Sequence, residues 1–258
     1  MILRELENIL SDVGLINGDI ICVHSDITSF GIPNILKDKV RKYGFNIILD
    51  SYIDTFKSVV GMEGLVLMPT FSYSATKGEI FYVNETKSDV GSMTDYFRTK
   101  KNVYRSHHPI FSFAAWGNNA EEYLHLCDYD CFGMKSIFGK IYDMNAKYVL
   151  FGLSIPNGLS AVYFSEQRVN AYYRYFKEIE SVINDGHREY KKKIKYFVRD
   201  KKLNYRDSWY NLEKKALEQE IAINTQYNGG KIFIIQSQRI DDLIIGELKK
   251  NKDFLIVK

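Results

Sequence analysis

The 258 residues are enough to bury the core of one large domain or two small ones. A hydrophobic share of 45% and a charged share of 26% are typical of a globular protein and exclude disordered, collagen-like and coiled-coil chains. The net charge of +3 is too small to indicate nucleic-acid binding by itself, and no apolar stretch approaches the ~20 residues of a membrane-spanning helix.

The first half of the chain alternates helical patterns with short, wholly apolar runs that are typical of buried strands. We expect helices at residues 2–14, 34–60, 91–101, 118–126 and 136–144, and strands at residues 20–23, 64–69, 110–116 and 147–152. Acidic residues lie among the apolar ones of the first helix, so this segment does not have the pattern of a signal peptide.

The second half continues the alternation. We expect a helix at residues 160–169, a small antiparallel unit with strands at 172–179 and 191–198, a strand at 231–235 and a helix at 237–249. Asp207 is expected to cap a further helix that reaches about Ile221. The alternation predicts an α/β fold with a sheet that is at least partly parallel. No repeat or linker is visible, which favours a single domain over residues 1–258.

The charge is distributed unevenly along the chain. Residues 188–202 carry eight basic and two acidic side chains, a local charge of +6 that leaves −3 for the rest of the chain. This segment is typical of a solvated strand pair whose charged edge resists aggregation. It could instead form a rim that attracts a phosphorylated ligand.

Three cysteines, Cys22, Cys127 and Cys131, form no disulfide framework, which favours a reduced, cytoplasmic protein. The pair at positions 127 and 131 has the spacing of metal ligands, but His125 is the single further ligand nearby. We therefore expect no metal.

A loop rich in hydroxyl groups follows the first predicted strand. Ser25, Thr28 and Ser29 lie in residues 24–31, and ligands of open α/β sheets bind beyond the carboxyl ends of strands. Their hydroxyl and backbone donors could cradle a phosphate, although the loop by itself is more typical of a polar turn that caps the next helix. The loop is neither a Walker A nor a G-x-G-x-x-G motif, so nucleoside triphosphate and dinucleotide binding have no support.

Two adjacent histidines, His107 and His108, precede the third predicted strand. An imidazole can accept a proton at neutral pH. The alternative is a surface histidine pair in front of a core strand with Phe111, Phe113 and Ala115 on one face.

Tyr163 and Glu166 are three residues apart on a predicted helix and therefore share a face. A buried Glu166 could orient a partner, but an amphipathic helix with an exposed glutamate has the same pattern. The chain has no G-x-S-x-G elbow and no H-E-x-x-H motif, so hydrolase and zincin chemistry are not indicated. The aromatic run at residues 171–176 is more typical of a core strand than of a surface that stacks nucleic-acid bases.

In order, these segments resemble the aminoglycoside 3-N-acetyltransferase family and its relatives in surface-sugar biosynthesis. The matching stretches are 23–31 (VHSDITSFG), 68–73 (MPTFSY), 91–98 (GSMTDYFR), 105–109 (RSHHP), 114–117 (AAWG), 136–140 (SIFGK), 149–152 (VLFG) and 173–177 (YRYFK). The resemblance implies a three-layer α/β/α fold with a mixed, partly parallel central sheet and a small C-terminal antiparallel strand unit. It also implies transfer of an acyl group from acetyl-CoA, or another acyl-CoA, to an amine.

The sequence departs from the family pattern at the residues that carry the chemistry. The family's base is a histidine in a His-x-x-Glu pair, and here Glu166 is present while the histidine position holds Tyr163. A frequent Phe-Asp pair falls on Phe81-Tyr82, and a second family histidine falls on Phe111, so that His108 alone remains of that motif. A phenol with a pKa near 10 is a poor base at neutral pH.

The resemblance then implies His108 as base or oxyanion donor, Tyr163 as proton donor to the leaving thiolate, and Glu166 as the orienting group. For coenzyme A we expect Ser25, Thr28, Ser29 and Gly31 at the phosphates, and Ser106, His108 and Phe113 along the pantetheine arm. Because the chain is net positive, the expected partner is a nucleotide-linked amino sugar of surface polysaccharide synthesis rather than a polycationic aminoglycoside. A member without turnover that binds a ligand or partner is the alternative, and a homodimer stays open.

Overall fold

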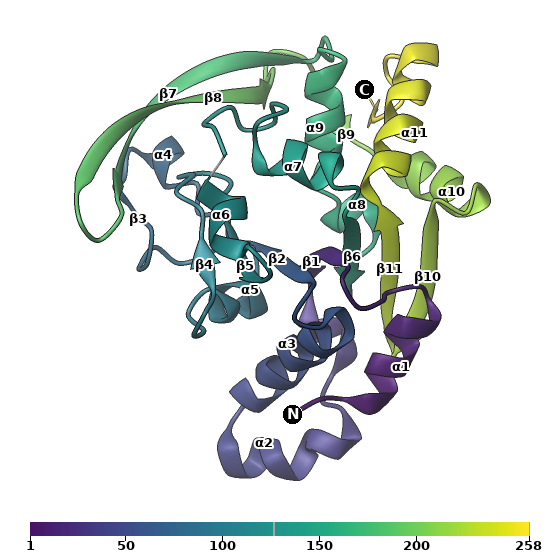
Figure 1. The fold of residues 1–258 in the computed structure, drawn as a ribbon. Helices are drawn as coiled ribbons and strands as arrows, with labels where there is room; N and C mark the ends of the chain where they lie inside the picture. The colour runs from purple at the N-terminus through teal and green to yellow at the C-terminus, as the bar shows by residue number, and fades with distance from the viewer. Residues whose placement is uncertain (126, 258) are drawn as a thin grey trace.

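A mixed seven-stranded sheet forms the centre of the molecule, with helices on both of its faces (Figure 1). The computed structural model describes residues 1–125 and 127–257. The sheet order is β10-β11-β6-β1-β2-β5-β4, in which β1 pairs parallel with β2 and β6 and every other pairing is antiparallel. The strands are β1 (Ile20–Ser25), β2 (Leu65–Pro69), β4 (Tyr104–Arg105), β5 (Phe113–Gly117), β6 (Lys147–Phe151), β10 (Ala222–Tyr227) and β11 (Gly230–Gln236).

The short apolar runs form strands because both faces of the sheet are covered. Side chains alternate along β1, so that Ile21 and Val23 enter one core while Cys22 enters the other. The first core lies under α1 (Arg4–Asp12), α3 (Asn46–Val60) and α5 (Ser92–Phe97). The second lies under α6 (Ala120–His125), α7 (Ile137–Asp143), α9 (Ala161–Arg168), α10 (Tyr210–Glu218) and α11 (Ser237–Lys250). The predicted three-layer α/β/α fold is confirmed.

Shorter elements complete the fold. A second sheet has the order β3-β7-β8, and its long antiparallel β7–β8 hairpin forms a curved arm (Figure 1). Its strands are β3 (Phe81–Tyr82), β7 (Arg174–Asn184) and β8 (Glu189–Arg199); β9 (Arg206–Asp207) and β12 (Ile256–Val257) form a third sheet. The remaining helices are η1 (Ile27–Phe30), η2 (Asn34–Leu36), α2 (Lys37–Tyr43), α4 (Ser74–Lys77) and α8 (Ile155–Gly158). Within the described residues, no helix is long and apolar enough to span a membrane.

Several predicted boundaries are wrong for local reasons. The expected helix at 34–60 is divided at Gly44, whose φ of +82° ends α2. The strand expected from Ile110 begins only at Phe113, because residues before it form a turn around Pro109. Asp207 belongs to β9, where it pairs with Ile256, so it does not cap α10. Position 126, the predicted end of a helix, lies outside the described residues.

The edge hairpin β10–β11 contains a strand that we did not predict. β10 is mostly polar (AINTQY), so its apolar pattern is weak. Its turn, however, is Asn228-Gly229, with φ values of +45° and +85°. Asn-Gly flanked by alternating residues is a strong hairpin signal, and it identifies this strand in retrospect.

Arg105 connects three segments from inside the protein. Its guanidinium donates hydrogen bonds to the carbonyl oxygens of Thr70 at 2.7 Å and Val83 at 3.0 Å, and to that of Thr86. Arg105→Lys keeps the charge but loses the planar fork, so we expect the free energy of unfolding to fall by about 1–3 kcal/mol. Urea denaturation measures this loss. Arg41→Lys, at a side chain that is 82% exposed, should change stability by less than about 0.5 kcal/mol; equal effects of the two substitutions would contradict the assignment.

Candidate active site

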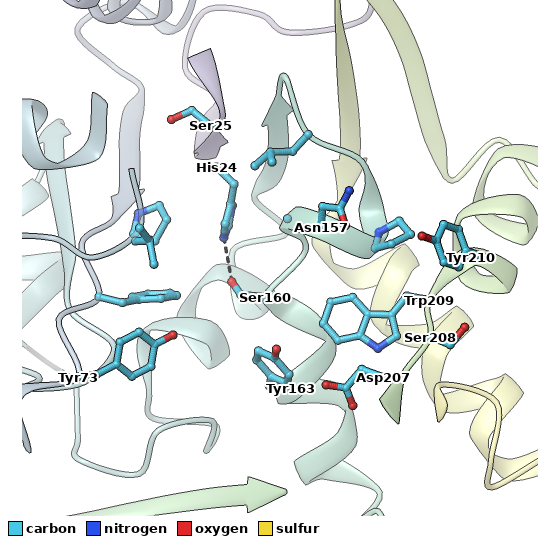
Figure 2. A pocket seen from close by; sticks show the side chains of 16 residues that line it. His24, Ser25, Tyr73, Asn157, Ser160, Tyr163, Asp207, Ser208, Trp209 and Tyr210 are labelled. Atoms are coloured by element: carbon cyan, nitrogen blue, oxygen red, sulfur yellow. Dashed lines mark hydrogen bonds between the residues drawn. The ribbon is translucent and has the colours of Figure 1, made fainter. Parts of the chain in front are cut away.

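A pocket of about 500 Å³, here called the main pocket, opens at the carboxyl ends of β1, β2 and β6 (Figure 2). β1 has a parallel neighbour on each side, which is the place where open α/β sheets bind ligands. The labelled wall residues are His24, Ser25, Tyr73, Asn157, Ser160, Tyr163, Asp207, Ser208, Trp209 and Tyr210. Segments far apart in the sequence therefore converge on one cavity.

His24 and Ser160 are in direct contact at the wall of the main pocket. The distance between His24 Nε2 and Ser160 Oγ is 2.8 Å, and Figure 2 shows the imidazole pointing from β1 to the hydroxyl group. Burial lowers the pKa of His24 to about 4, an effect that a backbone hydrogen bond at Cys22 partly opposes. The imidazole is therefore neutral at pH 7. Ser160 precedes α9, and its side chain does not cap the helix.

Tyr163 lies on the first turn of α9, beside Ser160. Its ring packs against Trp209 at 5.6 Å between centroids and under the Arg174 guanidinium at 4.8 Å. Burial raises the pKa of Tyr163 to about 12, so the phenol stays protonated and can donate a hydrogen bond at neutral pH. Figure 2 shows the Tyr163 and Tyr73 hydroxyl groups on the same side of the pocket as Ser160.

Glu166 is fully buried one helical turn beyond Tyr163 and does not line the pocket. Its Oε2 atom lies 2.7 Å from Arg174 Nε, and Arg174 also approaches Asp207 at 3.9 Å. Burial raises the pKa of Glu166, while the Arg174 guanidinium acts in the opposite direction. Glu166 therefore reaches Tyr163 indirectly, through the guanidinium that covers the Tyr163 ring.

Three polar atoms at the main pocket have no hydrogen-bond partner among the described residues. They are Ser25 Oγ, Trp209 Nε1 and Asp207 Oδ1, all of them buried. A buried donor or acceptor without a partner costs about 1–3 kcal/mol. Two donors and one acceptor without partners in one cavity fit a ligand with both donor and acceptor groups.

The loop at residues 24–31, here called the hydroxyl loop, contains residues that stabilise the loop itself and residues that line a cavity. Ser25 lines the main pocket, and Ser29 lines an adjoining hollow that shares Leu153 and Asn157 with it. Thr28 donates its hydroxyl hydrogen bond to Asp26, which caps η1, and Gly31 ends that element with φ +57°. The structure thus shows both a polar cap and a surface that could face a ligand.

Ser106, His108 and Phe113 do not reach the main pocket. Ser106 and His108 line a separate cavity of about 70 Å³ with Tyr129. His108 Nδ1 accepts hydrogen bonds from the backbone N–H groups of Ile110 at 3.2 Å and Phe111 at 3.0 Å, which fixes the turn before β5. We expected one cleft to hold this imidazole and the hydroxyl loop, but His108 lines the smaller cavity while Ser25 of the loop lines the main pocket. His108 Nε2 is buried and has no hydrogen-bond partner among the described residues.

Phe113 and Ser106 are also part of the framework. The Phe113 ring is fully buried and packs edge-on against Phe71 and Phe138. Its backbone N–H donates to Ser106 Oγ at 3.0 Å. These contacts join β4 to β5, and neither side chain faces the cavity that Ser25 and Tyr163 line.

The basic segment at 188–202 lies mainly on β8, outside the walls of the main pocket. Lys191 pairs with Glu180 at 3.0 Å and Lys195 with Asp130 at 3.3 Å, so part of its charge is compensated across the hairpin. Among the described residues that line the main pocket, Asp207 has the carboxyl side chain, and no lysine or arginine is present. In the described part of the chain, no group of three histidine, cysteine or acidic side chains is arranged to hold a metal ion.

Sequence reasoning assigned no role to His24, Ser160 or Tyr73, although all three lay in stretches that it singled out. His24 and Ser160 are 136 positions apart, so their contact has no signal in the sequence. Tyr73 adopts a left-handed backbone with φ +53°, uncommon outside glycine and frequent at functional sites. A polar residue that directly follows a buried strand was the one signal available for His24.

Residues 22–247 match the model of the aminoglycoside 3-N-acetyltransferase family, and the chain belongs to this family of acetyl-CoA-dependent N-acetyltransferases. One curated relative is the SPbeta prophage-derived aminoglycoside N(3')-acetyltransferase-like protein YokD of Bacillus subtilis (strain 168). It is 24% identical over 236 residues, which cover 82% of this chain and 78% of YokD.

Solved structures show the same fold. Aminoglycoside acetyltransferase AAC(3)-Xa superimposes with a TM-score of 0.80 at 15% identity, over 98% of this chain and 94% of that one. AAC-IIIb in a binary complex with CoASH gives a TM-score of 0.78 at 18% identity, over 97% of each chain. The family that the sequence motifs indicated is thus confirmed.

Proposed function

We propose that this protein is a coenzyme A-dependent N-acyltransferase that moves an acetyl group from acetyl-CoA to the amine of an amino sugar in the main pocket. The observation that carries the proposal is the convergence of His24, Ser160 and Tyr163 with unpaired buried donors, in one cavity of a member of an N-acetyltransferase family. AAC-IIIb has been solved with CoASH, which supports the same co-substrate here.

For this reaction the protein has mainly to position the two reactants and to transfer a proton. A neutral amine attacks the thioester carbonyl, the N–C bond forms, and the C–S bond breaks. We propose that Tyr163 donates a hydrogen bond to the sulfur as it leaves, and that Glu166 holds Tyr163 in place through Arg174. Ser25, with Ser29 in the adjoining hollow, would contact the coenzyme, while Thr28 and Gly31 shape the loop.

The acceptor is proposed at the level of an amino sugar. A nucleotide-linked sugar of polysaccharide synthesis was inferred from the net charge, but the basic segment lies outside the pocket walls. Structures exist of a histidine-to-alanine variant of AAC(3)-IVa with apramycin and of AAC-VIa with sisomicin. Asp207 at the wall offers a partner to an ammonium group, so aminoglycosides belong in the substrate panel with nucleotide-linked amino sugars.

A second candidate function is binding without turnover. Tyr163 occupies the position of the family's histidine, and a phenol whose pKa is raised cannot replace that base. In this case the pocket would still bind coenzyme A or an amino sugar. Turnover is therefore the property that separates the two candidates.

Calorimetry with CoASH and turnover of acetyl-CoA with both classes of amine test the proposal. We expect CoASH to bind and kcat to fall about 10–100-fold in Tyr163→Phe, because one donor to the developing charge is lost. Tyr43→Phe, at an exposed ring on α2, is the control and should leave kcat unchanged. Absence of CoASH binding would contradict the proposal, and binding with no turnover would favour the second candidate.

The same assay examines His108. A folded His108→Gln protein that loses kcat, while Tyr163→Phe retains it, would place the proton acceptor in the smaller cavity and contradict the assignment to the main pocket.

A further inference from the structure

The main pocket needs a proton acceptor that the family motif does not supply. An ammonium product of the attack must lose a proton before the amide is stable, and a positioned base contributes about 10²–10⁴ to such a step. The motif position holds Tyr163, a donor at neutral pH, and His108 lies in another cavity. Any acceptor has to come from other groups on the pocket wall.

The acidic groups near the site are poorly placed for this role. Asp207 lies 3.9 Å from Arg174 and 3.8 Å from Arg199, so two guanidinium groups hold its negative charge. Glu166 is fully buried behind the wall and paired with Arg174. Burial raises the pKa of Glu166, but this side chain does not line the cavity and cannot take a proton from the amine directly.

His24 is the one histidine among the described residues that line the main pocket. Its Nε2 atom faces the hydroxyl of Ser160 at 2.8 Å. Ser160 and Tyr163 are three residues apart at the start of α9, so the hydroxyl that contacts His24 and the phenol open on one side of the cavity (Figure 2). A serine hydroxyl bonded to an imidazole nitrogen can pass a proton in either direction.

We propose that Ser160 and His24 form the proton-transfer pair of this protein and replace the imidazole that the family places at position 163. This inference rests on the proposed acyl transfer and assigns its missing base. As the amine nitrogen bonds to the thioester carbon, its proton passes to Ser160 Oγ while the serine proton passes to His24 Nε2. When the C–S bond breaks, His24 returns the proton through Ser160 to the thiolate. The products are the acetamide and CoASH, and the pair regains its starting state.

The environment of His24 suits a transient acceptor. Burial keeps the free imidazole neutral, with the pKa of His24 lowered to about 4, so one of its two ring nitrogens carries no proton. The proposed step uses the tautomer in which that nitrogen is Nε2, which faces Ser160. The negative charge that develops on the carbonyl oxygen during attack lies in the same cavity and favours the imidazolium for the duration of the step. The proton is then passed on readily, because the imidazolium is unstable once that charge has gone.

The test is a double-mutant cycle on kcat with acetyl-CoA and the amine that wild type uses best. We expect Ser160→Ala and His24→Asn each to lower kcat by about 10²–10⁴, and the double variant to lose little more than either single one, because the two residues act as a unit. Ser160→Thr keeps the hydroxyl and should restore most of the activity. Ser58→Ala and His187→Asn, away from the pocket, are the matched controls.

Calorimetry with CoASH on every variant separates this inference from the proposed function. Retained CoASH affinity with lost kcat supports the pair. The proposal is overturned if Ser160→Ala keeps both its CoASH affinity and a kcat within about threefold of wild type. It is also overturned if the losses in kcat of the two single variants add in the double variant. A wild-type protein that binds CoASH but acetylates no amine also overturns it, and an acetyl group found on Ser160 by mass spectrometry replaces proton transfer with a covalent step. A wild-type protein that does not bind CoASH removes the proposed function itself.

Discussion

Arg174→Met is expected to lower the free energy of unfolding by about 3–5 kcal/mol, the usual cost of removing one partner from a buried ion pair. The Arg174 side chain is 6% exposed and faces both Glu166 and Asp207. Methionine fills part of the volume but leaves Glu166 without its positive partner, while Asp207 keeps Arg199 at 3.8 Å. The guanidinium also covers the Tyr163 ring, so kcat should fall together with stability.

The stability lost in Arg174→Met should depend on pH, and the raised pKa of Glu166 sets the direction of that dependence. Burial already raises the pKa of Glu166 from 4.5, and removal of Arg174 takes away the group that opposes this rise. A carboxyl group whose folded pKa exceeds its unfolded value binds its proton more tightly in the folded state. Its contribution to stability is present in full below about pH 4.5 and disappears as the pH rises through the folded pKa. The variant should therefore be less destabilised at pH 5 than at pH 8.

Urea denaturation of wild type, Arg174→Met and Glu166→Gln at both pH values measures this effect. Glu166→Gln keeps the shape of the side chain and removes the titrating group, so its free energy of unfolding should vary less with pH than that of Arg174→Met. A deficit below about 1 kcal/mol for Arg174→Met, or one that is larger at pH 5 than at pH 8, would contradict the assigned ion pair.

Gly152→Ala is expected to destabilise the protein by about 3 kcal/mol or more and to weaken CoASH binding at least tenfold. Gly152 has φ +79°, and an added Cβ would lie 2.1 Å from the carbonyl oxygen of Asp26 and 2.9 Å from the Phe30 ring. Ser29 donates a hydrogen bond to the Gly152 carbonyl oxygen at 2.9 Å. The hydroxyl loop therefore has to move away from β6 to admit a methyl group.

Gly14→Ala is the matched control for backbone strain alone. Gly14 has φ +93°, but an added Cβ would meet nothing within 4 Å. We expect a loss of about 1–2 kcal/mol from the left-handed backbone and no change in CoASH affinity. Thermal unfolding and calorimetry on both variants provide the comparison. Similar losses of stability and affinity in the two would contradict the close packing of the loop against Gly152.

The sequence predicted the layers of the fold because burial leaves a local pattern. The central strands β1 and β6 each contain an uninterrupted apolar run, as expected for strands covered on both faces, and β1 divides its side chains between the two cores. The unpredicted strand β10 lies at the sheet edge, where one face is wet and the apolar pattern is weak. Only its Asn-Gly turn indicates this strand in the sequence.

The site could be predicted only in part, because its decisive contacts join distant segments. Helical spacing correctly placed Tyr163 and Glu166 on one element, but the partner of Glu166 is Arg174, on the strand that follows. Family motifs led to His108, whose nitrogen the backbone of its own turn uses. The pairing of His24 with Ser160 depends on how α9 packs at the end of β1. The periodic patterns of the sequence do not indicate where one element packs against another.

A crystal structure of the protein with CoASH bound tests the central claim most directly. We expect the thiol sulfur in the main pocket, within about 4 Å of Ser160 Oγ or the Tyr163 hydroxyl, with the coenzyme passing the hydroxyl loop. A thiol located in the smaller cavity beside His108, or outside both cavities, would contradict it.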